Sequence, residues 1–135
     1  MNRTEKAEQL ARDFLALLNR NAPVEDYLKY LPDGDFEQWS YPEVEIKNLE
    51  HLKGFFAQTW GMIKSQNNEI TTITSRELES GRIELEVSVN WSAETATGQK
   101  FARPLHYQMT IMDGSSSGDP VGQFPKIMRY KMTRG

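Results

Sequence analysis

The sequence predicts an α+β domain in which helices cover one face of a curved antiparallel sheet. Amphipathic helical patterns lie in the first half of the chain, and long segments of alternating apolar and polar residues follow in the second half. Helical patterns separated in this way from a run of strands are typical of α+β domains. The length of 135 residues suits one domain with one core, so a single domain over residues 1–135 is expected.

Three helices are predicted, over residues 4–20, 24–31 and 49–63. Thr4 is a suitable cap for the first helix and Asn48 for the third, because their side-chain oxygens can accept a hydrogen bond from the first turn. The apolar residues of the first helix recur with the period of one helical face. They are Ala7, Leu10, Ala11, Phe14, Leu17 and Leu18.

Strands are predicted in the remainder of the chain, and glycines mark the turns between them. Gly81 and Gly98 stand at two short connections, which join antiparallel neighbours and therefore favour a meander. A longer connection over residues 113–123 has the composition of a mobile loop. The predicted strands cover residues 35–41, 69–78, 82–94, 100–112 and 124–133.

The alternation of residues 83–91 indicates which face of the sheet is covered. Every second residue from Ile83 to Trp91 is apolar, so this set is expected to face the helices, while Glu84, Glu86 and their neighbours face away. The same reasoning places odd-numbered residues of the next strand inside and His106 outside, unless Pro104 shifts the register. His51 falls on the outer face of the third helix.

Composition excludes several classes of function. There is no cysteine and there are two scattered histidines, which predicts no metal site and no cofactor. The net charge of -3 argues against nucleic-acid binding, and no apolar segment approaches the length of a membrane span. The first residues lack the pattern of a secretory signal, so a cytoplasmic location is expected.

The chain resembles the nuclear transport factor 2-like (NTF2-like) superfamily, which includes the SnoaL-like polyketide cyclases and the ketosteroid isomerases. The residues that carry the resemblance are "ARDFLALLN" at 11–19, "WSYPEVEIKNLEHLKGFF" at 39–56 and the long strands that end near "MDG" at 112–114. The resemblance implies a cone-shaped, cystatin-like fold with three helices on the concave side of the sheet. It also implies a pocket between helices and sheet, and a homodimer formed through the outer face of the sheet.

The same resemblance argues against the ketosteroid isomerase mechanism. It places Phe14 at the tyrosine donor and Trp39 at the carboxylate base, and neither side chain can perform that role. Tyr107 falls at the second hydrogen-bond donor. Glu37 shares the Trp39 side of its strand, so it is expected to be the one inward carboxylate, with a pKa raised by burial against the indole ring.

Two functions are compatible with these residues. The favoured one is a homodimer that binds a small hydrophobic molecule, with Arg103 near the mouth of the pocket to attract an acid or an enolate. The alternative is a cofactor-free isomerase, polyketide-cyclase-like enzyme or dehydratase that uses Glu37 and Tyr107, while an adaptor with a filled interior is a third hypothesis. The predicted ligand-binding residues are Phe14, Trp39, Tyr41, Trp60, Trp91, Arg103 and Met109.

Overall fold

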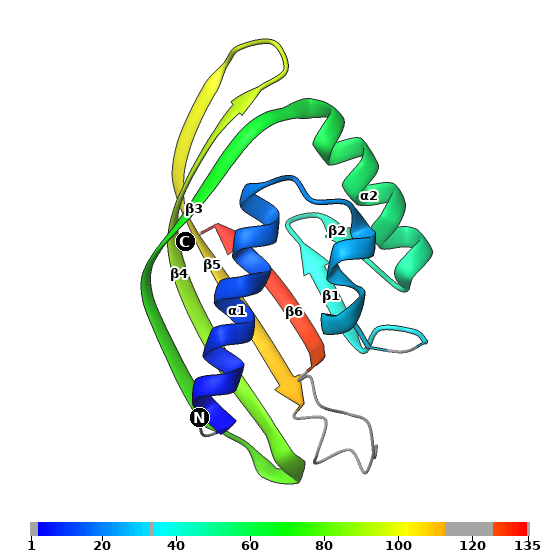
Figure 1. Ribbon diagram of the computed structural model, residues 1–135, viewed down its shortest axis with the longest axis vertical. Helices are drawn as coiled ribbons and strands as arrows, with labels where there is room; N and C mark the ends of the chain where they lie inside the picture. The colour runs from blue at the N-terminus through cyan, green and yellow to red at the C-terminus, as the bar shows by residue number, and fades with distance from the viewer. Residues whose placement is uncertain (1–2, 33, 113–125, 135) are drawn as a thin grey trace.

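The α+β fold predicted from the sequence is confirmed by a computed structural model, which describes residues 3–32, 34–112 and 126–134 (Figure 1). The connection predicted over residues 113–123 lies outside the described residues, as do the first two residues of the last predicted strand. The elements are α1 (Arg3–Asn19), η1 (Val24–Tyr30), β1 (Gln38–Tyr41), β2 (Val44–Glu45), α2 (Leu49–Met62), β3 (Ile63–Glu77), η2 (Glu79–Gly81), β4 (Arg82–Thr95), β5 (Lys100–Met112) and β6 (Lys126–Arg134).

The strands form one curved, six-stranded sheet with the order β2-β1-β6-β5-β4-β3. Strands β3 to β6 pair as the predicted antiparallel meander. The short strand β1 pairs in parallel with β6, which places Trp39 opposite Tyr130. This pairing brings a segment from the first third of the chain beside the last strand, and both contribute side chains to the concave face.

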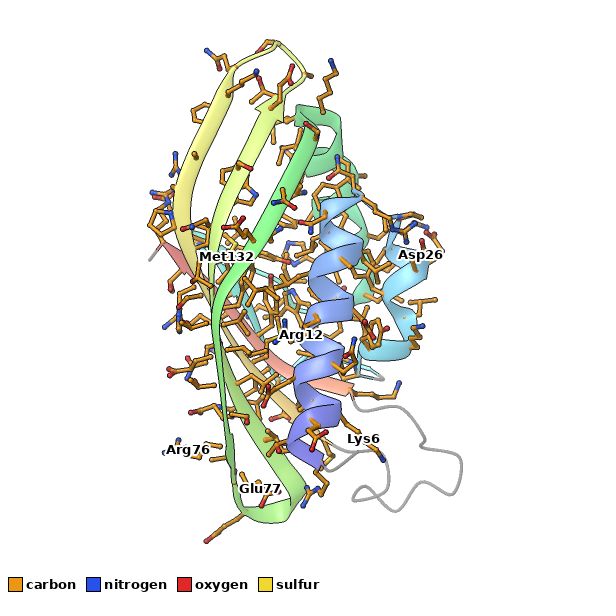
Figure 2. The ribbon with its side chains drawn as sticks, turned by 60° about the vertical axis from the view of Figure 1, so that its left-hand side comes forward. Lys6, Arg12, Asp26, Arg76, Glu77 and Met132 are labelled. Carbon is orange, nitrogen blue, oxygen red and sulfur yellow. The ribbon has the colours of Figure 1, made fainter. Side chains whose placement is uncertain are left out.

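The helices all lie on the concave side of the sheet (Figures 1 and 2). Helix α1 crosses the sheet, and its predicted apolar stripe is buried except for the half-buried Leu17, with Phe14 fully inaccessible to solvent. Figure 2 shows side chains filling the space between α1 and the strands. Helix α2 lies over one end of the sheet, and its cap is the predicted one, because the Asn48 side chain accepts a hydrogen bond from the His51 backbone N–H at 2.9 Å.

The predicted alternation in β4 and β5 is confirmed. Ile83, Leu85, Val87 and Val89 are buried on the concave face. Pro104 lies directly opposite Asn90 without a register shift, so His106 pairs with Ser88 on the outer face. The Ser88 hydroxyl lies 3.3 Å from Nδ1 of His106, in agreement with the predicted outward position.

The second predicted helix is present as the short 3-10 helix η1. Two other local predictions are wrong. Thr4 lies inside α1 and is not its cap, because the helix already includes Arg3. Strand β3 begins at Ile63, six residues earlier than expected, and its first residues pair with the end of β4. The first part of this strand is polar, so it lacks the alternation that would have predicted it. Gln66 and Asn68 in this part face inward, where their side-chain amides form hydrogen bonds.

Candidate functional site

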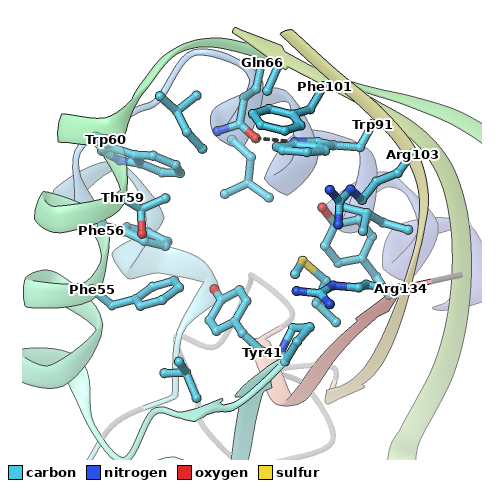
Figure 3. Close-up of a pocket in the computed structure, with 18 of the residues that line it drawn as sticks. Tyr41, Phe55, Phe56, Thr59, Trp60, Gln66, Trp91, Phe101, Arg103 and Arg134 are labelled. Carbon is cyan, nitrogen blue, oxygen red and sulfur yellow. Dashed lines mark hydrogen bonds between the residues drawn. The ribbon is translucent and has the colours of Figure 1, made fainter. Parts of the chain in front are cut away.

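A cavity of about 410 Å³ lies between α2 and the concave face of the sheet (Figure 3). This volume is in the range of pockets that hold small organic molecules. The residues that line the cavity are Leu18, Tyr41, Pro42, Val44, Phe55, Phe56, Thr59, Trp60, Ile63, Gln66, Trp91, Ala93, Thr95, Phe101, Arg103, Leu105, Tyr107, Tyr130, Met132 and Arg134.

One wall of the cavity consists of stacked aromatic rings. Phe55 stacks on Tyr41 with 4.4 Å between ring centroids, and Phe56 stacks on Trp60 at 5.0 Å. The indole N–H of Trp60 donates to the backbone carbonyl of Ala22 at 2.9 Å, which fixes the orientation of this ring. Since α2 supplies three of these four rings, the helix presents a flat apolar surface to the cavity.

A chain of amides supports the opposite end of the cavity. The indole N–H of Trp91 donates to Oε1 of Gln66 at 3.0 Å, and the Gln66 amide donates to Oδ1 of Asn21 at 2.8 Å. Asn21 in turn donates to the backbone carbonyl of Ile63 at 3.0 Å. Asn21 has a φ of 49°, a left-handed conformation that asparagine tolerates better than most residues. The network therefore holds Trp91 in place without a charged group.

A second polar group, the hydroxyl of Tyr107, lies at the floor of the cavity, and Tyr107 is 2 % exposed. Its hydroxyl donates to Oδ1 of Asn68 at 2.7 Å, and the Asn68 amide donates to Oδ1 of Asn19 at 3.0 Å. Burial raises the pKa of Tyr107 well above its usual value. The hydroxyl therefore keeps its proton at neutral pH, and that proton is already used in a hydrogen bond.

The other two tyrosines of the cavity also remain protonated at neutral pH. Burial raises the pKa of Tyr41 to about 12, although its hydroxyl accepts a hydrogen bond from the indole N–H of Trp39 at 3.2 Å. Burial raises the pKa of Tyr130 as well. Because these phenols hold their protons, none of them can serve as a general base near pH 7 without a large loss of driving force.

Five of the nine predicted site residues line the cavity, and four do not. Tyr41, Trp60, Trp91, Arg103 and Tyr107 contribute to its walls. Three of the other four are fully buried in the core below it, where they support the cavity without lining it. They are Phe14, Trp39 and Met109.

The expected position of Glu37 is wrong. Glu37 does not line the cavity, and its side chain is 35 % exposed in a network with two arginines. Arg82 donates to both carboxylate oxygens, at 3.0 and 2.7 Å, and Arg129 lies 3.5 Å from one of them. The hydrogen bonds from Arg82 lower the pKa of Glu37, the opposite of the expected rise. Glu37 precedes β1 (Gln38–Tyr41), so the alternation read from Trp39 does not extend to it.

Sequence reasoning missed Phe55, Gln66 and Arg134. Phe55 stands beside the apolar stripe of its helix, and a stripe widened by one position includes it. Arg134 follows Tyr130 and Met132 at a spacing of two, and all three line the cavity, so alternation along β6 was a usable signal. Gln66 had no such signal, because a polar residue in a polar segment does not indicate an inward position.

Neither histidine reaches the cavity. His51 is exposed on α2, and His106 lies 3.8 Å from Glu86 on the outer face of the sheet. Among the described residues, no group of three or more carboxylates and histidines is placed to bind a metal. Within the same residues, no helix is long and apolar enough to cross a membrane.

The fold has many counterparts among solved structures, whereas the sequence matches no family model and no curated protein. An NTF2-like superfamily protein from Salmonella enterica serovar Typhimurium LT2 superposes with a TM-score of 0.82 at 7% identity, over 97% of this chain and 89% of the other. Hexachlorocyclohexane dehydrochlorinase LinA-type3 from Novosphingobium barchaimii LL02 superposes with a TM-score of 0.77 at 12% identity, covering 97% and 85%.

Nuclear transport factor 2 from Cryptosporidium parvum is a third counterpart, with a TM-score of 0.70 and 10% identity, over 95% of this chain and 90% of the other. The chain therefore has the NTF2-like fold, as its resemblance implied. Because an enzyme and a transport factor share this fold, the fold alone does not specify a function.

Proposed function

We propose that this protein binds a small hydrophobic molecule in the cavity between α2 and the sheet. The observation that carries the proposal is a cavity of drug-like volume with stacked aromatic rings on one side. Ring faces provide large apolar contacts to a flat ligand. Hydrogen bonds already hold the indole rings of Trp60 and Trp91 in place, so little conformational entropy is lost in ordering these rings when a ligand binds.

Binding is favoured over catalysis by the acid–base character of the walls. Among the described residues, the titratable groups that line the cavity are two arginines and three tyrosines, and burial raises the pKa of each tyrosine so that it holds its proton at neutral pH. The dehydrochlorinase of the same fold is an enzyme by name, but an isomerase or dehydratase would need a group that removes a proton near pH 7. Glu37, the residue expected to do so, is held by Arg82 outside the cavity.

The binding site can be tested by filling the cavity with one larger side chain. Thr59 lines the cavity from α2, and the neighbouring Gln58 is exposed on the same helix. N-phenyl-1-naphthylamine, a neutral aromatic probe whose fluorescence rises in apolar surroundings, is titrated into the wild type, Thr59→Phe and Gln58→Phe. We expect Thr59→Phe to weaken probe binding by roughly tenfold or more, because the added ring occupies space that the probe needs. A tenfold loss of affinity corresponds to only part of the free energy that an aromatic ligand gains from its contacts. Equal affinity in Thr59→Phe and Gln58→Phe would refute the proposed site.

We further propose that the protein forms a homodimer through the outer face of the sheet. Glu84 and Glu86 lie on that face of β4, and Arg129 and Lys131 lie on the same face of β6, with β5 between them. A two-fold axis over β5 would place the acidic strand of one copy above the basic strand of the other. Opposite charges that meet in this way favour one symmetric pairing of the two faces.

Sedimentation equilibrium tests this arrangement. Lys131→Glu is expected to weaken the dimer by roughly tenfold, and adding Glu86→Lys should restore part of the loss, because the two changes exchange charges across the proposed axis. A monomer at micromolar concentration in the wild type would refute the dimer.

The predicted cytoplasmic location is a separate proposal, which cell fractionation tests.

A further inference from the structure

Two arginines from neighbouring strands line the cavity. Arg103 is on β5 and Arg134 is on β6, and Leu105 pairs directly with Arg134. Arg103 lies two residues from Leu105 on the same face of the sheet, so the two arginines are diagonal neighbours, at about 7–8 Å in a typical antiparallel pair. Figure 3 shows both guanidinium groups across the cavity from the rings of Phe55 and Phe56.

These two charges have no counter-ion within the described part of the chain. No carboxylate from the described residues lines the cavity, and neither guanidinium makes an ion pair there. The outward-facing Arg82 and Arg129 differ, because both engage Glu37. Both arginines are exposed, so water solvates their charges, and an anion placed between them would be attracted by both.

The remaining walls of the cavity define the rest of the ligand. The side that faces the arginines is apolar and aromatic, formed by Phe55, Phe56 and Trp60. A guanidinium binds a carboxylate or sulfonate through paired N–H groups, whereas ring faces bind flat apolar groups. A molecule that satisfies both walls has an anionic group at one end and a flat ring system at the other.

We propose that the ligand of this cavity is an aromatic acid, with its anionic group between Arg103 and Arg134 and its rings against Phe55 and Trp60. The inference rests on the proposed binding function and specifies the chemical class of the ligand. A neutral hydrocarbon of the same size would contact only the aromatic wall, whereas an acid would contact the aromatic wall and also bind the two arginines.

A matched pair of fluorescent probes tests the proposal. 1-Anilinonaphthalene-8-sulfonate and N-phenyl-1-naphthylamine share the same ring system, and the first carries a sulfonate in addition. Both are titrated into the wild type, into Arg103→Gln/Arg134→Gln, and into Lys6→Gln/Lys53→Gln. The control variant removes two positive charges from exposed positions of α1 and α2, outside both the cavity and the outer face of the sheet.

The arginine variant is expected to bind the sulfonate probe roughly tenfold or more weakly, because hydrogen bonds to a charged group are among the strongest that a site provides. Its affinity for the neutral probe should change by less than about twofold, since the apolar wall is intact. The control variant should leave both affinities unchanged. Raising the salt concentration should weaken the sulfonate probe and not the neutral one.

The outcomes separate this inference from the proposed function. If the wild type binds the neutral probe and the arginine variant keeps its affinity for the sulfonate probe, the acid preference is refuted and the binding function stands. An equal loss in the lysine control would also refute it, because a general charge effect would explain the result. If neither probe binds the wild type, the proposed function itself fails. Retained binding of the neutral probe shows that the arginine variant is folded.

Discussion

The two ends of the concave face contain the same kinds of residue and yet differ in packing. Under α1 the rings of Phe14, Tyr27 and Trp39 pack into a solid core, with 5.3 Å between the ring centroids of Phe14 and Tyr27. Under α2, stacked rings surround a cavity of about 410 Å³. Aromatic composition therefore does not decide whether this fold is filled or hollow.

The position of the end of α1 explains the difference. The helix ends at Asn19, and Asn21 adopts a left-handed conformation immediately afterwards, so the chain leaves the sheet there. The amides of Asn19 and Asn21 hold Asn68 and Gln66 of β3 at this boundary. Past the end of α1, helix α2 lies over the sheet at one end of the molecule (Figure 1). Side chains of α1 fill the space above the rest of the sheet, whereas the space between α2 and the sheet remains open as the cavity.

The largest expected effect comes from removing a ring on the filled side. Phe14→Ala should lower the free energy of unfolding by about 4 kcal/mol, because Phe14 is fully buried and its removal leaves a void that close-packed neighbours cannot fill. Phe55→Ala, on the hollow side, should cost only about 1 kcal/mol, since Phe55 is already partly exposed and borders the cavity. Urea denaturation of both variants measures the difference.

Similar costs for the two phenylalanines would contradict the contrast between the ends of the sheet. The pair is well matched, because both residues are in helices and both changes delete the same ring. A large cost for Phe55→Ala would mean that the cavity walls are as closely packed as the core. In that case the adaptor hypothesis, with a filled interior, would regain support.

The filled end was largely predictable from the sequence. The helical period of Ala7 to Leu18 and the alternation of Ile83 to Val89 each indicate one buried face, and both faces are buried as expected. These signals are strong because burial of apolar side chains is the main force that folds the chain. The order of strands in the meander followed from the short turns at Gly81 and Gly98.

The hollow end was only partly predictable. The residues that shape it are polar, or their role depends on where neighbouring elements begin and end, and neither property leaves a periodic apolar pattern in the sequence. Gln66 and Asn68 face inward from a segment without apolar residues, so no periodic signal marks it as a strand. Glu37 was misplaced by extending the alternation of β1 beyond the point where the strand begins. Whether an aromatic residue such as Trp39 lines a cavity or fills a core depends on how far α1 extends over it, which spacing within one strand does not reveal.

A smaller effect is expected at the boundary between the two ends. Asn68→Ala removes the acceptor of the Tyr107 hydroxyl and should lower the free energy of unfolding by about 2 kcal/mol, because a buried donor without a partner is costly. Asn67→Ala, at the exposed neighbouring position, should change it by less than about 0.5 kcal/mol.

Tyr107→Phe in the Asn68→Ala background determines why the first change is costly. If the unpaired hydroxyl is the cause, deleting it should recover part of the lost stability, since both partners of the hydrogen bond are then absent. If Asn68→Ala costs no more than Asn67→Ala, water from the cavity has replaced the amide at Tyr107. The boundary would then be wet, and the solid core would begin one layer deeper, at residues such as Met109 that are fully buried.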